Sequence, residues 1–157
     1  MLSLAGTQSQ DRFAPDRKDA MRPHVMIVDD STDQLNFMLM VFRLVDPNLI
    51  VVAKESGDEA LALLQHEPES RPKVLLLDIR MPGRGGLDVL REMKAHQHLR
   101  RIPVCTFSNG DVGKEICAAY EAGASIYFVK PTGLEETKRF VDAFKRIWFD
   151  HASFCVH

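Results

Sequence analysis

Three aspartates and one lysine stand at the ends of short apolar runs. Asp78 closes one such run, and the turn-forming Pro82 follows shortly after it. Asp29 and Asp30 close a second run, and Lys130 closes a third. A buried strand that delivers a single carboxylate to the start of a loop suits a carboxylate nucleophile. Asp78 is therefore the candidate nucleophile.

The other charged groups predict what this nucleophile would attack. Two or three carboxylates that converge without a cation would repel one another, and a hard divalent ion such as Mg²⁺ resolves the conflict because it prefers oxygen ligands. Lys130 adds a positive charge that suits a phosphoryl oxygen, and Ser108 adds a hydroxyl donor. Together these residue types indicate a site for phosphoryl transfer, in which charge stabilisation is the main catalytic device.

The elements that must position these groups alternate along the chain. Near-continuous apolar runs predict parallel strands covered on both faces. Amphipathic segments between them predict helices, and Ser31-Thr32-Asp33 can cap the first of them. The predicted strands are 24–29, 49–53, 73–77, 102–107 and 125–129. The predicted helices are 32–46, 57–65, 86–96, 111–121 and 134–150. This alternation predicts an α/β doubly wound, five-stranded parallel sheet of flavodoxin-like type with strand order 2-1-3-4-5. Its switch point lies between the first and third strands, where the three aspartates would meet.

Four motifs of this sequence resemble the receiver domain of two-component response regulators. They are Val28-Asp29-Asp30-Ser31, Leu77-Asp78-Ile79-Arg80-Met81-Pro82-Gly83, Ile102-Pro103-Val104 leading to Ser108, and Ala122-Gly123-Ala124 leading through Tyr127 to Lys130-Pro131. The resemblance spans about residues 24–148, with the motifs in the family's order and spacing.

The resemblance implies a phosphorylation site with a bound metal ion. Asp78 would accept the phosphoryl group and would also be a ligand of Mg²⁺. Asp30 would bind the ion directly, Asp29 would bind it through water, and the backbone carbonyl of Arg80 would be a further ligand. The long cationic side chain of Arg80 would overhang the acyl phosphate, where it could shield the phosphoryl group from water or pair with a partner.

The resemblance also implies how phosphorylation is read out. Lys130 would hold the phosphoryl group, Ser108 would be the switch hydroxyl, and Tyr127 would be the switch aromatic residue. It further implies a cis Lys130–Pro131 peptide bond. Asn109 departs from the small residue that the family usually has after the switch hydroxyl, which leaves the amplitude of the loop's movement open.

Size, charge and cysteine content bound the class of protein. A chain of 157 residues with 45% hydrophobic residues fits one domain. We expect an N-terminal extension over 1–22, the receiver domain over 23–150 and a tail over 151–157. A formal net charge of −2 provides no basic field for nucleic acid. No apolar run is long enough to cross a membrane, and three cysteines without a Cys-x-x-Cys motif predict no disulfide framework, with Cys105 and Cys117 in or near the core. We therefore expect a cytoplasmic protein.

Each of these residues alone has an ordinary explanation, such as a helix cap for Asp29 and Asp30 or a turn serine for Ser108. Their joint placement at successive strand ends favours a signalling switch, a stand-alone receiver phosphorylated by a sensor histidine kinase or phosphotransfer protein. Its output would come through a partner, through dimerisation, or through service as a phosphate sink. A phosphatase with an aspartate nucleophile is an alternative, although such enzymes usually place an acid where Arg80 stands. A flavin-binding protein of the flavodoxin type is a third reading, which the acidic cluster disfavours.

The last predicted helix carries more apolar surface than its own core requires. We expect it to form a homodimer through Phe140, Phe144, Ile147, Trp148 and Phe149. The alternative is a helix whose far flank is covered by the short tail. This aromatic segment is similar to the C-terminal helix of the single-domain regulators that partner phytochrome-type histidine kinases.

Overall fold

The computed structural model describes residues 22–110 and 113–153. Its core is a five-stranded parallel sheet in the order β2-β1-β3-β4-β5, as the sequence predicts. The strands are β1 (Val25–Val28), β2 (Val51–Lys54), β3 (Val74–Asp78), β4 (Val104–Ser108) and β5 (Ile126–Val129). The three central strands are buried along their whole length, which explains their near-continuous apolar sequences.

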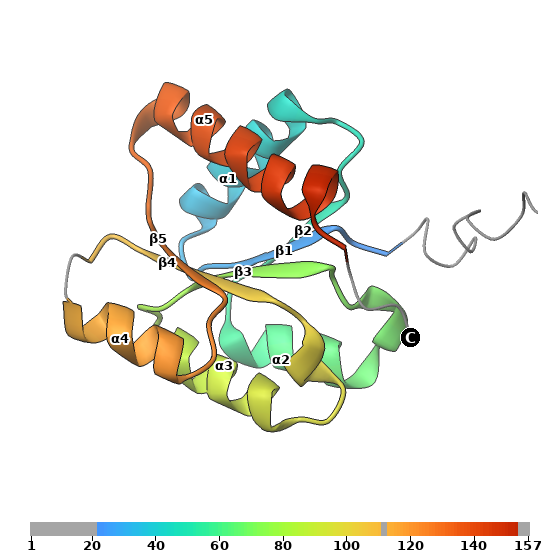
Figure 1. Ribbon diagram of the computed structural model, residues 1–157, viewed down its shortest axis with the longest axis vertical. Coiled ribbons are helices and arrows are strands. Elements are labelled where there is room, and N and C mark those ends of the chain that lie inside the picture. Colours follow the sequence, from blue (N-terminus) through green and yellow to red (C-terminus); the bar gives the residue numbers. More distant parts are fainter. Residues whose placement is uncertain (1–21, 111–112, 154–157) are drawn as a thin grey trace, which may run out of the picture.

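Helices cover both faces of the sheet (Figure 1). The helices are α1 (Thr32–Val45), α2 (Gly57–His66), α3 (Gly86–Ala95), α4 (Gly113–Glu121) and α5 (Gly133–Lys145). Helices α1 and α5 lie on one face, and α2, α3 and α4 lie on the other. Two short 3₁₀ turns, η2 (Pro68–Ser70) and η3 (Leu99–Arg101), precede β3 and β4. The hydroxyls of Ser31 and Ser56 cap α1 and α2 by accepting hydrogen bonds from the backbone N–H groups three residues further on.

The last helix differs from its prediction in two ways. Its regular α-helical part ends at Lys145, and a π-helical segment, η4 (Arg146–His151), continues it. Its aromatic residues turn toward their own sheet: Phe144 is 1% exposed, and Phe140, Trp148 and Phe149 pack against the same core cluster. Of the five residues predicted to form a dimer interface, Ile147 stands out as exposed, at 46%. The prediction that all five face a partner is therefore wrong, because the apolar arc of this helix covers the edge of its own sheet.

Three smaller predictions, on the cysteines, on the chain segments outside the core domain and on membrane helices, have different outcomes. Cys105 is fully buried, as predicted, whereas Cys117 is exposed on α4. The start of the fourth helix predicted at Asp111 and most of the N-terminal extension and tail lie outside the described residues. Among the described residues no helix is long and apolar enough to cross a membrane.

Candidate phosphorylation site

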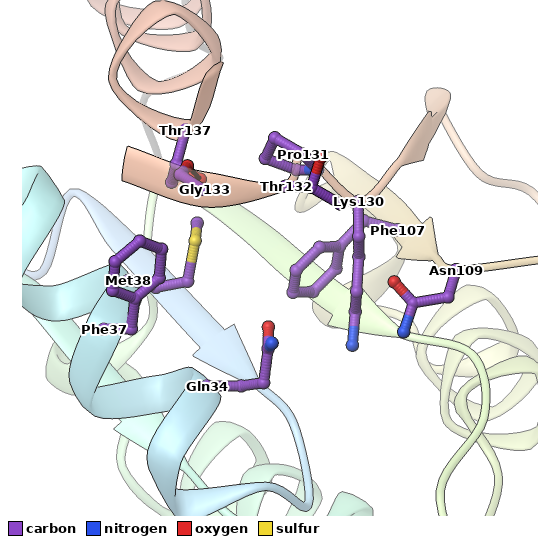
Figure 2. A pocket seen from close by; sticks show the side chains of 10 residues that line it. All are labelled: Gln34, Phe37, Met38, Phe107, Asn109, Lys130, Pro131, Thr132, Gly133 and Thr137. Carbon is purple, nitrogen blue, oxygen red and sulfur yellow. Dashed lines mark hydrogen bonds between the residues drawn. The ribbon is translucent and has the colours of Figure 1, made fainter. Parts of the chain in front are cut away.

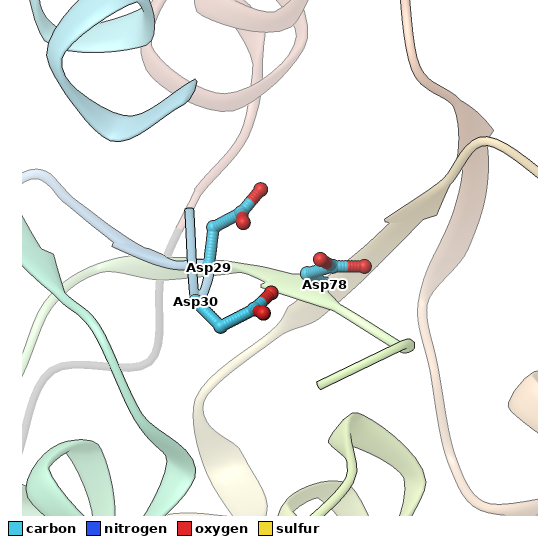
Figure 3. Close-up of side chains that lie close together, drawn as sticks. All are labelled: Asp29, Asp30 and Asp78. Atoms are coloured by element: carbon cyan, nitrogen blue, oxygen red, sulfur yellow. The ribbon is translucent and has the colours of Figure 1, made fainter. Parts of the chain in front are cut away.

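Three carboxylates meet at the carboxyl ends of β1 and β3 (Figure 3). Each of Asp29, Asp30 and Asp78 offers an oxygen, and these oxygens all lie within 4.8 Å of one another. Asp29 and Asp78 are buried, whereas Asp30 is exposed. Because β1 and β3 are neighbours that pair in parallel register from Val25 and Val74, their ends deliver these side chains to one place. The switch-point prediction is thereby confirmed.

Lys130 reaches into this acidic cluster from the end of β5. Its Nζ lies 2.9 Å from Asp29 Oδ2 and 3.2 Å from Asp78 Oδ2. The same ammonium group lies 4.9 Å from the centroid of the Phe107 ring, a cation–π contact. The lysine side chain is only 8% exposed, so these contacts are shielded from solvent. The predicted neighbourhood of three acids and one lysine is thus present.

Burial and charge oppose each other in this cluster. Loss of solvation raises the pKa of Asp78 above its ordinary value, the charge of Lys130 lowers it in part, and the charge of Asp29 raises it further. For Lys130, burial alone would lower the pKa, but the hydrogen bond to Asp29 and the charge of Asp78 outweigh burial, so that its pKa is raised. Lys130 is therefore a firmly charged ammonium group, and Asp78 is a carboxylate whose negative charge is costly to keep.

The backbone around the acids fixes their orientation. Asp29 Oδ1 accepts a hydrogen bond of 2.9 Å from the N–H of Ser31, and Asp78 Oδ1 accepts one of 3.1 Å from the N–H of Arg80. A Cβ atom on Gly86 would lie 2.1 Å from the carbonyl oxygen of Asp78. Only glycine therefore allows α3 to start so close to the main chain of Asp78.

The Lys130–Pro131 peptide bond is not cis, because no described residue has a cis peptide bond. The implied cis bond is thus a wrong expectation. Trans is the more stable isomer of an X–Pro bond by about 0.5–1 kcal/mol.

Ser108 and Tyr127 belong to a second cluster, which centres on Glu115 of α4. The Tyr127 hydroxyl lies 2.8 Å from Glu115 Oε1 and 2.9 Å from the carbonyl oxygen of Gly110. Glu115 Oε2 accepts a hydrogen bond of 2.9 Å from Arg80 Nε, and Ser108 Oγ accepts one of 3.3 Å from the N–H of Gly110. We call these five residues, Arg80, Ser108, Gly110, Glu115 and Tyr127, the Glu115 cluster.

The sequence gives no signal for Glu115. It lies in the first turn of α4, where an acidic residue is common for helix stability alone. Although burial alone would raise the pKa of Glu115, hydrogen bonds from Tyr127, Arg80 and Ser108 lower it below its ordinary value. The cluster therefore contains a carboxylate that is ionised at neutral pH. Glu115 meets Arg80 only because α4 packs beside the loop after β3. No local sequence pattern encodes that packing.

A hollow of about 340 Å³ opens beside Lys130 (Figure 2). It is lined by residues from α1, from the end of β4, from the β5–α5 connection and from the start of α5: Gln34, Phe37, Met38, Phe107, Asn109, Lys130, Pro131, Thr132, Gly133 and Thr137. The lining combines apolar and polar side chains. Lys130 belongs both to this lining and to the acidic cluster, in which Asp78 is only 4% exposed.

The acidic cluster has the chemistry that a hard divalent cation requires. Mg²⁺ takes oxygen ligands and is commonly held by one or two carboxylates together with phosphate oxygens and water. Asp30 and Asp78 offer such oxygens, and Asp29 lies beside them. The donor set therefore fits Mg²⁺. The role predicted for the backbone carbonyl of Arg80 stays a prediction.

The parallel sheet order and the acid–lysine cluster at its switch point define a receiver-type fold. Residues 25–142 match the family model of the response regulator receiver domain. The chain belongs to this family.

Individual relatives are similar over most of their length. The response regulator Rcp1 of Synechocystis sp. is 28% identical over 132 residues, which cover 80% of this chain and 88% of Rcp1. The two-component response regulator ORR11 of Oryza sativa is 32% identical over 74% of this chain and 77% of its own. The phosphorylated cyanobacterial phytochrome response regulator RcpA superposes with a TM-score of 0.77 at 27% identity, covering 84% of this chain and 97% of RcpA. The Mn²⁺-bound form of Rcp1 superposes with a TM-score of 0.75 at 25% identity, covering 85% of this chain and all of Rcp1.

Proposed function

We propose that this receiver accepts a phosphoryl group on Asp78 from a phosphohistidine, with Mg²⁺ bound at Asp29, Asp30 and Asp78. The observation that carries the proposal is the contact of one buried ammonium group with two buried carboxylates, 2.9 Å from Asp29 and 3.2 Å from Asp78. Such an ammonium group can bind the carboxylate of Asp78 before the transfer and an oxygen of the phosphoryl group after it. Family membership, and a Mn²⁺-bound relative at 25% identity, support the same site.

The reaction would form one bond and break another. An oxygen of Asp78 forms the new bond to phosphorus, the bond between phosphorus and the donor's imidazole nitrogen breaks, and the imidazole keeps that electron pair. A bound Mg²⁺ would neutralise charge on the acids and the phosphoryl oxygens. Lys130 supplies a fixed positive charge that needs no reorganisation.

Labelling with acetyl phosphate and Mg²⁺ tests the nucleophile. We expect wild type to incorporate one phosphoryl group and Asp78→Asn to incorporate none. Asp33→Asn, which removes an exposed acid from the first turn of α1, is the matched control and should label like wild type. Equal labelling of Asp78→Asn and wild type would refute the assignment.

The contacts of Arg80 count against the phosphatase alternative. An aspartate-based phosphatase needs a protonated acid near the nucleophile to protonate its leaving group. The carboxylate that lies beside Arg80 is Glu115, whose pKa is lowered by its hydrogen bonds although burial opposes them. An ionised carboxylate cannot donate that proton. Turnover distinguishes the two functions, because a receiver labels itself once and releases phosphate slowly.

A sensor histidine kinase, of phytochrome type, is the partner that we propose. The support is similarity to Rcp1 and to RcpA, a cyanobacterial phytochrome response regulator. Comparing the rates of phosphoryl transfer from a panel of purified kinases would identify the partner. A homodimer through the last helix is also proposed, with Ile147 rather than the inward-facing aromatic residues at its surface.

A further inference from the structure

Arg80 connects the nucleophile to α4. Its backbone N–H donates to Asp78 Oδ1 at 3.1 Å, so its side chain starts beside the carboxylate. From there the side chain runs across the loop after β4, since a Cβ on Gly110 would lie 2.2 Å from Arg80 Nη2. It ends at Glu115, with Nε 2.9 Å from Oε2. One side chain thus spans from the phosphorylation site to the first turn of α4.

The two partners in this ion pair differ in their freedom to move. The Arg80 side chain is 54% exposed, whereas that of Glu115 is 15% exposed. The other carboxylate oxygen of Glu115 is held by the Tyr127 hydroxyl at 2.8 Å. Arg80 can therefore leave the pair by rotating a long solvated side chain, but Glu115 stays in place.

A phosphoryl group on Asp78 would offer Arg80 a second anion. It adds about −1.5 to −2 charges and three strong acceptor oxygens, next to the residue from which the Arg80 side chain starts. A guanidinium group binds phosphate in the same forked geometry in which it binds carboxylate. While Arg80 Nε donates to Glu115 Oε2 at 2.9 Å, that donor is not available to a phosphoryl oxygen, so the two anions compete for one guanidinium group.

We propose that Glu115 competes with the phosphoryl group of Asp78 for Arg80, and so acts as a positioning residue that weakens binding at the phosphorylation site while it holds α4. This inference rests on the proposed function of Asp78. It adds a second connection between the site and α4, in which Arg80 changes its ion-pair partner. The first is the connection expected through Ser108 and Tyr127.

Beryllofluoride binding in the presence of Mg²⁺ tests the competition, with isothermal titration calorimetry as the measurement. Glu115→Gln keeps the size of the side chain and an acceptor for Tyr127 but removes the charge that holds Arg80. We expect it to bind beryllofluoride about two- to fivefold more tightly than wild type, the size expected from losing a largely exposed ion pair. In an Arg80→Met background the same Glu115→Gln change should have no effect on affinity.

Asp142→Asn is the matched control, because it removes an ion pair of similar type, Arg146 with Asp142 at 3.1 Å, far along the chain on α5. Its affinity should equal that of wild type. If the role of Glu115 is purely structural, Glu115→Gln should bind beryllofluoride as wild type does or more weakly, or should bind it more tightly to the same extent with and without Arg80. Any of these results overturns the competition. Circular dichroism of each variant shows whether it is folded, and Arg80→Met, which changes only an exposed side chain, gives the second arm of the cycle.

The same titrations separate this inference from the proposed function. Binding by wild type that is lost in Asp78→Asn supports the phosphorylation site whatever the Glu115 variants do. No binding by wild type would contradict the proposed function and the competition together.

Discussion

At the scale of single residues, the acidic cluster holds negative charge at a cost. Asp78 is 4% exposed, and burial, with the nearby charge of Asp29, raises its pKa despite the charge of Lys130. An acid whose folded-state pKa is raised lowers stability once the pH exceeds its ordinary pKa, and the loss is complete above the folded-state pKa. The negative charge of Asp78 therefore destabilises the metal-free fold, and it lies where the proposed metal ion and phosphoryl group would bind.

We predict that Asp78→Asn raises the stability of the metal-free protein at neutral pH, by an amount on the order of 1 kcal/mol, within the usual range for single substitutions. The asparagine keeps an acceptor for Lys130 but carries no charge. The gain should vanish at acidic pH, below the ordinary carboxyl pKa, where Asp78 is protonated in both states.

Urea unfolding in EDTA, followed by the fluorescence of the single tryptophan, Trp148, measures this effect. Mg²⁺ should stabilise wild type and leave Asp78→Asn nearly unchanged, because a ligand stabilises only the state that binds it. Asp33→Asn, which removes an acid from the favourable end of a helix, should give no gain. A destabilised Asp78→Asn at neutral pH would show that pairing with Lys130 outweighs burial.

At the scale of elements, the sequence predicted both ends of each strand within two residues, and the strand order in full. Apolar runs such as 74–77 are strong local signals for buried parallel strands, and the capping serine Ser31 marked the start of α1. The Glu115 cluster could not be predicted from the sequence, because no local signal marks it. Its members come from β4, α4, β5 and the loops after β3 and β4. They meet only when those segments pack, so their spacing in the chain carries no information about the contact.

The position of α4 should respond to the phosphorylation site. We predict that an environment-sensitive dye on Cys117, which is exposed on α4, changes its emission when beryllofluoride and Mg²⁺ are added. Cys155→Ser restricts labelling to this thiol, because Cys105 is buried and burial raises its pKa to about 12. Ser108→Ala should still bind beryllofluoride but lose most of the signal, since the hydroxyl that links the site to Tyr127 is gone.

A dye on α2 provides the control for that experiment. In a Cys117→Ser, Cys155→Ser, Glu59→Cys variant the dye would sit on an exposed position of α2, an element that contributes no residue to the Glu115 cluster. Its emission should not change on adding beryllofluoride. Equal responses from both positions would mean that the dye senses the anion rather than a movement of α4, and a full response in Ser108→Ala would exclude the hydroxyl as the link.

At the scale of the whole molecule, the last helix both completes the core and forms part of the outer surface. Phe140 and Phe144 pack edge-on against Phe128 of β5, and the Trp148 ring lies tilted beside that of Phe144, with the ring centroids 6.4 Å apart. The sequence predicted a large apolar arc here but not which way it faced, because a helical wheel gives the width of the arc and not the amount of sheet that it has to cover. The surface left for a partner is smaller than the arc suggests.

We predict that two neighbouring substitutions on this helix have different effects. Ile147→Glu changes a side chain that is 46% exposed, so the thermal midpoint should stay close to that of wild type. Trp148→Glu places a charge against the core and should destabilise the fold by about 2–4 kcal/mol. If the proposed homodimer forms, light scattering at micromolar concentration should give wild type about twice the chain mass of 17.8 kDa, and Ile147→Glu about one chain mass. A monomeric wild type, with and without beryllofluoride, would exclude the dimer and leave the core-packing role of Trp148 intact.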